Sequence, residues 1–145
     1  MKSLTHKFVE YMPETLDSGV VYVSIPFSLV SHKCCCGCGE EVVTPLSPTD
    51  WELIFDGETV SLYPSIGNWN FKCRSHYWIR RDRVEWAPQM SGERIQAGRY
   101  LDSLAKDRYF RRLEEKNASS EAAVKSSINK GKRRSFLRGL GRKKN

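Results

Sequence analysis

The chain has 145 residues, of which 39% are hydrophobic and 28% are charged. This length accommodates one domain, or one small domain with an appendage, and the composition is that of a water-soluble protein. No apolar run approaches the roughly 18 residues that a membrane-spanning helix needs, so such a span is excluded. The first residues lack the apolar core of a signal peptide, and we expect a cytoplasmic protein.

The net charge of +7 is concentrated at one end of the chain. Eight of the 24 Lys and Arg residues lie between Lys130 and Asn145, where there is no Asp or Glu, and the other 16 are balanced by 17 acidic residues. A basic groove across the folded part is therefore not expected. The tail is equally compatible with nucleic-acid or anionic-membrane binding and with a solvated, disordered segment.

The first half of the chain predicts short β-strands, beginning with residues 19–24, which are rich in β-branched and aromatic side chains. Residues 51–62 predict a hairpin, because Asp56-Gly57 between two alternating runs is the preferred sequence of a type I′ turn. Residues 63–69 predict a loop from their Pro and Gly-Asn content. Residues 77–86 predict a second hairpin, which turns at Arg81-Asp82.

After Pro88 the hydrophobic period changes to that of amphipathic helices, spanning about Glu93 to Glu115. The sequence thus predicts a small, mainly β, metal-stabilised domain built from two hairpins around a Cys/His site, followed by a helical segment and a disordered basic tail. The corresponding boundaries are 1–88 for the zinc-binding β domain, 89–116 for the helical extension and 117–145 for the flexible tail.

Four of the five cysteines fall within residues 34–38, and the fifth begins the Cys-x-x-His of Cys73 and His76. Cytoplasmic thiols stay reduced. A cluster this dense therefore indicates a metal site rather than disulfides. Thiolates and a neutral imidazole are the ligands that Zn²⁺ takes tetrahedrally. Two hairpins bury little apolar area, and a structural zinc would contribute on the order of 10 kcal/mol to folding.

The candidates outnumber the four ligands that zinc requires. We favour a Cys₃His set because Cys-x-x-His is a common ligand spacing; its members are Cys36, Cys38, Cys73 and His76. The alternative replaces His76 by Cys34, since alternate residues of an extended segment share a face. In that case the set is Cys₄ and His76 is free for another role.

The motifs around this cluster resemble a known bacterial family. They are His-x-Cys-x-Cys-Gly-Cys-Gly at residues 32–39, Pro-Ser-Ile-Gly-Asn-Trp at 64–69 and Cys-Arg-Ser-His-Tyr-Trp-Ile at 73–79. Together they resemble domain-of-unknown-function family 6527, and the resemblance extends from about Phe8 to Trp86. Cys35 stands where that family usually has proline, which argues against Cys35 as a ligand and supports Cys34, Cys36 and Cys38.

The resemblance implies a role in bacterial operons that encode ubiquitin-like proteins with E1-like and E2-like enzymes. The function expected first is a zinc-binding accessory or interaction protein of such a pathway, with a ubiquitin-like, E1-like or E2-like protein as its partner. This expectation is an analogy between families rather than a mechanism.

Two other functions remain open. The first is a serine peptidase of that pathway, in which Ser65 is the nucleophile and His32, or His76 if the metal site is Cys₄, is the base. In the competing interpretation Ser65 only stabilises an irregular loop. The second is a small nucleic-acid-binding protein that acts through its basic tail.

Overall fold

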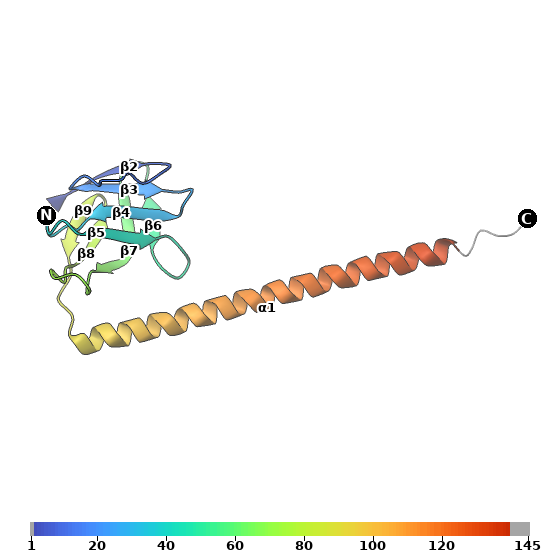
Figure 1. The fold of residues 1–145 in the computed structure, drawn as a ribbon. Helices are drawn as coiled ribbons and strands as arrows, with labels where there is room; N and C mark the ends of the chain where they lie inside the picture. Colours follow the sequence, from blue (N-terminus) through green and yellow to red (C-terminus); the bar gives the residue numbers. More distant parts are fainter. Residues whose placement is uncertain (1, 140–145) are drawn as a thin grey trace, which may run out of the picture. The chain divides into compact units, whose positions relative to one another are not determined.

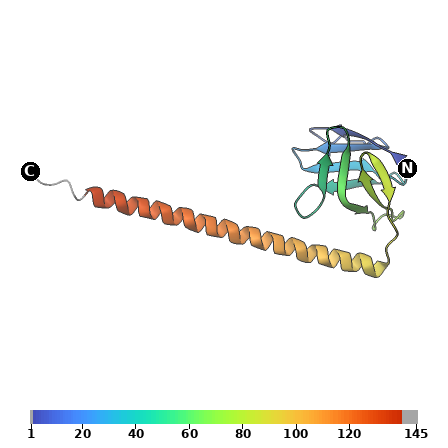
Figure 2. The ribbon, with the colours of Figure 1, turned by 180° about the vertical axis from the view of Figure 1, so that it is seen from behind.

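The computed structural model describes residues 2–139, with side chains up to residue 128. The chain divides after Tyr100 into a β unit and a helical unit. The β unit contains two sheets that share one core, as Figures 1 and 2 show from opposite sides. The expectation of a mainly β domain followed by helix is therefore confirmed.

The first sheet has five strands in the order β1-β9-β8-β7-β6. Its members are β1 (Lys2–Ser3), β6 (Glu52–Phe55), β7 (Val60–Gly67), β8 (His76–Arg80) and β9 (Arg83–Trp86). All its neighbouring strands are antiparallel. The second sheet has the order β2-β3-β4-β5, with β2 (Thr5–Phe8), β3 (Val20–Ser24), β4 (Leu29–Lys33) and β5 (Glu41–Pro45). Here β2 runs parallel to β3 and the other pairs are antiparallel.

The core lies between the two sheets and contains apolar residues from both. The fully buried ones include Val21, Val23 and Val30 of the second sheet and Leu62 and Ile79 of the first. Strand β5 shows the alternation that this arrangement requires, because Val42 and Thr44 are buried while the residues between and beside them are exposed.

Both hairpins are confirmed, but the type I′ turn is not where we predicted it. Asp56 does not have a positive φ; its carboxylate instead accepts hydrogen bonds from the amides of Glu58 and Thr59 and closes a longer loop. The second hairpin turns at Arg81 and Asp82, whose φ values of 48° and 55° are both in the left-handed region that a type I′ turn requires.

The predicted loop at residues 63–69 is largely strand, since β7 continues to Gly67. The Pro at position 64 is tolerated because the β7–β8 ladder is interrupted between Leu62 and Ile66, so that its missing N–H breaks no regular ladder bond.

Beyond the β unit the chain forms one long helix, α1 (Gly92–Gly139). Ser91 precedes it, and its hydroxyl accepts a hydrogen bond from the Arg94 amide, as an N-cap does. The helix continues past the end predicted at residue 116, because the Ala, Glu and Lys residues that follow favour helix even without an apolar face. The side chains from Lys130 to Arg138, and all of residues 140–145, lie outside the described part. Within residues 2–139 no helix is both long and apolar enough to cross a membrane.

Candidate active site and metal centre

Ser65 lies in a β-bulge of β7. Leu62 pairs with Ile79 and Ile66 pairs with Tyr77, so β7 has two more residues in this interval than β8. A bulge of this kind locally redirects side chains, and bulges are common next to active sites. Leu62 and Ile66 stay in the core while Ser65 between them is only half-buried.

The bulge brings Ser65 against His76, the first residue of β8. The Ser65 Oγ lies 3.0 Å from His76 Nε2, and His76 Nδ1 lies 2.8 Å from the backbone carbonyl oxygen of Pro88. A carbonyl oxygen can only accept, so Nδ1 carries the proton and Nε2 presents its lone pair to Ser65. The serine hydroxyl therefore donates to the imidazole, which is the arrangement of a nucleophile and its general base.

Two tryptophans flank the imidazole. The ring centroids of Trp69 and Trp78 lie 4.9 Å and 5.9 Å from that of His76. His76 is 8% exposed as a result. The indole of Trp69 also covers Gly67, where an added Cβ would lie 2.6 Å from Trp69 Cε2. Only glycine allows the indole to approach the strand this closely.

The cysteines come from two loops at the same end of the β unit. The loop between β4 and β5 contains Cys34, Cys36 and Cys38; it is closed by a hydrogen bond from the Cys34 amide to the Glu40 carbonyl oxygen (2.8 Å). The loop between β7 and β8 contributes Cys73.

The sulfur atoms of Cys34, Cys36, Cys38 and Cys73 all lie within 4.8 Å of one another. Three of their separations are 3.4 Å, 3.7 Å and 3.9 Å. A tetrahedron with metal–sulfur bonds of about 2.3 Å has sulfur–sulfur edges of about 3.8 Å. The four thiols thus have the spacing to hold one metal ion.

Ser75 and Asn68 hydrogen-bond these sulfurs: Asn68 Nδ2 donates to Cys34 Sγ at 3.8 Å, and the Cys73 thiol donates to Ser75 Oγ. The Ser75 Oγ lies 3.1 Å from Cys34 Sγ and 3.5 Å from Cys73 Sγ. Desolvation raises the pKa of the Cys73 thiol, but hydrogen bonds with Ser75, Cys36 and Cys38 together lower it to about 7, whereas the pKa values of Cys36 and Cys38 are raised. A lowered thiol pKa favours the thiolate that a metal ion binds.

The predicted ligands are thus only partly brought together. Cys36, Cys38 and Cys73 are gathered with Cys34, the alternative fourth ligand, whereas both ring nitrogens of His76 are engaged elsewhere. The Cys-x-x-His spacing favours His76 as a ligand, which stays a prediction. No sequence pattern indicates the contact of His76 with Ser65, because a separation of eleven residues does not set a distance in space.

His32 and Cys35 belong to neither the Ser65–His76 pair nor the four-sulfur group. His32 is buried between the sheets, where its Nε2 hydrogen-bonds the Tyr77 hydroxyl (2.9 Å) and burial lowers its pKa to about 4. Cys35 is buried outside the four-sulfur group, and burial raises its thiol pKa to about 11. Two groups that sequence reasoning missed are the Pro88 carbonyl and the Trp69 indole, neither of which has a residue-type signature.

Residues 8–87 match the model of the BubE family, described as the bacterial ubiquitination-like system serine protease. This segment is more than half of the chain. The chain belongs to this family. The matched segment contains Ser65, His76 and all four clustered cysteines, and it ends before α1. The expected link to a bacterial ubiquitin-like system is confirmed, while membership of family 6527 stays a prediction. No curated protein and no solved structure matches the chain.

Proposed function

We propose that this protein is a serine peptidase of a bacterial ubiquitin-like conjugation pathway, with Ser65 as nucleophile and His76 as general base. The observation that carries the proposal is the 3.0 Å contact between Ser65 Oγ and the lone-pair nitrogen of His76. The description of its family, which names a serine protease, supports the same activity. The accessory role that the sequence suggested first requires no such contact.

The chemistry follows from the orientation of the imidazole. Ser65 Oγ attacks the carbonyl carbon of the scissile peptide bond while its proton passes to His76 Nε2. The same proton then goes to the leaving amine as the carbon–nitrogen bond breaks and an ester to Ser65 remains. Water, deprotonated by His76, hydrolyses this ester and restores the serine.

The Pro88 carbonyl takes the place that a carboxylate occupies in a catalytic triad. It holds the imidazole in the tautomer that accepts from Ser65, and its dipole favours the imidazolium that forms during the reaction. A neutral acceptor stabilises that cation less than a carboxylate does. We therefore expect a slower enzyme than one with a full triad.

We further propose that the four clustered cysteines hold a structural Zn²⁺. Four sulfur ligands in a tetrahedral arrangement suit zinc, as they also suit iron, and they leave no open position for a catalytic water. The expected role is to join the two cysteine loops. Ser75 lies next to His76 in the chain and contacts Cys34, so the metal centre would also fix the start of β8.

The proposed substrates, and the partners of the protein, come from the same pathway. They are a precursor of a ubiquitin-like protein, or a conjugate formed by the E1-like and E2-like enzymes, because each contains a peptide bond that such a pathway must cut. The nucleic-acid hypothesis depends on the basic residues from Lys130 onward, whose side chains lie outside the described part of the structure.

The activity is tested with the full-length protein and a fluorophosphonate probe, which forms a covalent bond to an activated serine. We expect labelling of the protein at Ser65, and cleavage of a ubiquitin-like precursor encoded in the same operon. Ser65→Ala should abolish both. Ser61→Ala is the matched control, because Ser61 lies on the same strand but its hydroxyl accepts from the Arg81 amide. Unaltered cleavage by Ser65→Ala would remove Ser65 from the mechanism.

A further inference from the structure

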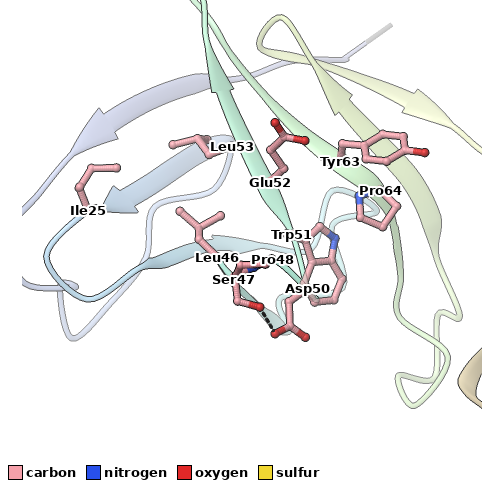
Figure 3. A pocket seen from close by; sticks show the side chains of 10 residues that line it. All are labelled: Ile25, Leu46, Ser47, Pro48, Asp50, Trp51, Glu52, Leu53, Tyr63 and Pro64. Atoms are coloured by element: carbon pink, nitrogen blue, oxygen red, sulfur yellow. Dashed lines mark hydrogen bonds between the residues drawn. The ribbon is translucent and has the colours of Figure 1, made fainter. Parts of the chain in front are cut away.

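A groove of about 570 Å³ opens beside Pro64, the residue that precedes Ser65. It lies between β7 and the segment that connects β5 to β6, as Figure 3 shows, and we call it the Trp51 groove after the indole in its wall. Its lining also includes Ile25, Asp50, Glu52 and Tyr63. The lining of the groove thus ends at Pro64, one residue before the proposed nucleophile on β7.

The strand pairing explains why a groove forms at this place. Strand β6 pairs with β7 only from Val60 to Tyr63, where Tyr63 faces Glu52. One residue before Glu52 the chain turns away, because the amide of Trp51 donates to the carbonyl oxygen of Pro45 and Trp51 bridges to Leu46. From Pro64 onward β7 thus has no strand beside it on this edge within the described residues.

An open strand edge next to a nucleophile is suited to an extended peptide. Main-chain groups of an added strand can pair with the edge, and alternate side chains of that strand enter pockets beside it. A peptide that continued the line of β6 past Glu52 would pass the bulge that contains Ser65.

The lining of the groove indicates which side chains it accepts. Its walls are mainly apolar, and Ile25 and Tyr63 are 57% and 61% exposed, so their apolar surface is free to contact a ligand. Its two charged residues are Asp50 and Glu52, and no Lys, Arg or His lines it. The Asp50 carboxylate already accepts a hydrogen bond from Ser47 Oγ at 2.6 Å. The carboxylates disfavour an acidic side chain in the groove.

We propose that the Trp51 groove is the substrate-binding site for an extended peptide, that it takes an apolar side chain next to the scissile bond, and that it rejects Asp and Glu there. This inference rests on the proposed peptidase function and assigns its substrate selectivity. Tyr63 and Ile25 provide the apolar contact, and Glu52 provides the charge selection.

The test measures binding without catalysis, in full-length protein that contains Ser65→Ala. A random peptide library displayed on phage is selected against this protein, and the Kd of the most enriched peptide is measured by fluorescence polarisation. We expect the selected peptides to share an apolar residue at one position and to lack Asp and Glu at the positions next to that residue. Adding Ile25→Ala should raise the Kd about tenfold, as losing part of an apolar pocket does. Val43→Ala, an equally exposed aliphatic residue on β5, should leave it unchanged.

A charge exchange tests the selectivity separately. Glu52→Lys, in the same background, should allow Asp and Glu into the selected peptides, whereas Glu41→Lys on β5 should not, because Glu41 does not line the groove. Absence of any enriched peptide, or a Kd insensitive to Ile25→Ala, would overturn the assignment of the groove. Tight, Ile25-dependent binding of peptides that the Ser65 protein does not cleave would instead contradict the peptidase function.

Discussion

Ser65 Oγ and His76 Nε2 lie 3.0 Å apart although Ser65 belongs to the middle of β7 and His76 to the start of β8. Regular antiparallel pairing would place residue 64 opposite Tyr77, whereas the bulge places Ile66 there. The two additional residues let Ser65 leave the sheet and turn its hydroxyl toward the imidazole. The Pro88 carbonyl fixes the ring from its other side.

His76→Ala should therefore abolish most of the activity without loss of the fold. General-base catalysis contributes about 10²–10⁴-fold, so kcat should fall by at least that range while the KM changes little. Steady-state cleavage of a peptide selected as above measures both constants. The double variant Ser65→Ala/His76→Ala should be no slower than Ser65→Ala alone. Additive losses would show that the two side chains do not act as a unit.

Gly67→Ala should disturb the site through Trp69. The new Cβ would lie 2.6 Å from Trp69 Cε2, so the indole must move from its place against His76. We expect kcat to fall about tenfold or more, since small displacements at an active site are costly. In a Trp69→Ala background the same substitution should have little further effect. Gly98→Ala is the control, because the space around Gly98 is open.

Metal analysis distinguishes the two ligand sets. We expect the purified protein to contain about one zinc per chain, and Cys34→Ser to lose it, while His76→Gln keeps it. Cys35→Ala, which removes a buried thiol outside the four-sulfur group, is the matched control and should keep the metal. Zinc lost from His76→Gln but kept in Cys34→Ser would restore the Cys₃His set.

Removal of the metal should destabilise the whole β unit. Structural zinc contributes on the order of 10 kcal/mol to folding, and here it would join loops from both sheets. Addition of a chelator should therefore remove the near-UV circular dichroism signal and the cooperative melting transition. A protein that keeps both after its zinc has been stripped would contradict a structural role for the metal.

Asn68→Ala should lower the free energy of unfolding by about 1–3 kcal/mol, because it leaves buried partners without a hydrogen bond. Asn68 Nδ2 donates to Ser75 Oγ at 2.9 Å and to the Tyr77 hydroxyl at 3.4 Å. Chemical denaturation of the zinc-loaded protein measures the change. Asn70→Ala, in the same loop, is the control, because the partner of Asn70 is the exposed Arg99. Equal stabilities of the two variants would contradict the importance of this network.

The hairpin loop at Asp56 predicts a pH dependence. Hydrogen bonds from the Thr59 hydroxyl and amide, and from the Glu58 amide, lower the pKa of Asp56 to about 2 from its usual 3.8. A carboxyl whose pKa is lower in the folded state stabilises it above the unfolded pKa and loses this effect as the pH falls. The melting temperature of the wild-type protein should exceed that of Asp56→Ala by a constant difference from pH 7 to about 4.5. Below pH 4.5 this difference should become smaller.

Glu58→Ala is the control for this loop, since the Glu58 side chain is exposed and only its amide takes part. The difference between its melting temperature and that of the wild type should not become smaller as the pH falls below about 4.5. A margin for Asp56→Ala that stays constant to pH 3 would show that the lowered pKa does not contribute to stability.

Residue type and local spacing were enough to predict the hairpins and the cysteine cluster. Alternating apolar residues predicted the two hairpins, and the density of Cys within residues 34–38 predicted a metal-compatible cluster. Both follow from local chemistry, since strand periodicity and thiolate affinity need no knowledge of distant contacts. The resemblance of the motifs at 32–39, 64–69 and 73–79 predicted the ubiquitin-like pathway, which the family match confirms.

Which candidate residues lie next to one another could be read only from the folded chain. Cys34 and His76 were equally available as fourth neighbours of Cys36, Cys38 and Cys73, and the choice depends on where the β7–β8 loop places Cys73. The contact of Ser65 with His76 depends on a bulge of two residues, which no local pattern specifies. The orienting group is a backbone carbonyl, which every residue has, so only its position in space identifies it.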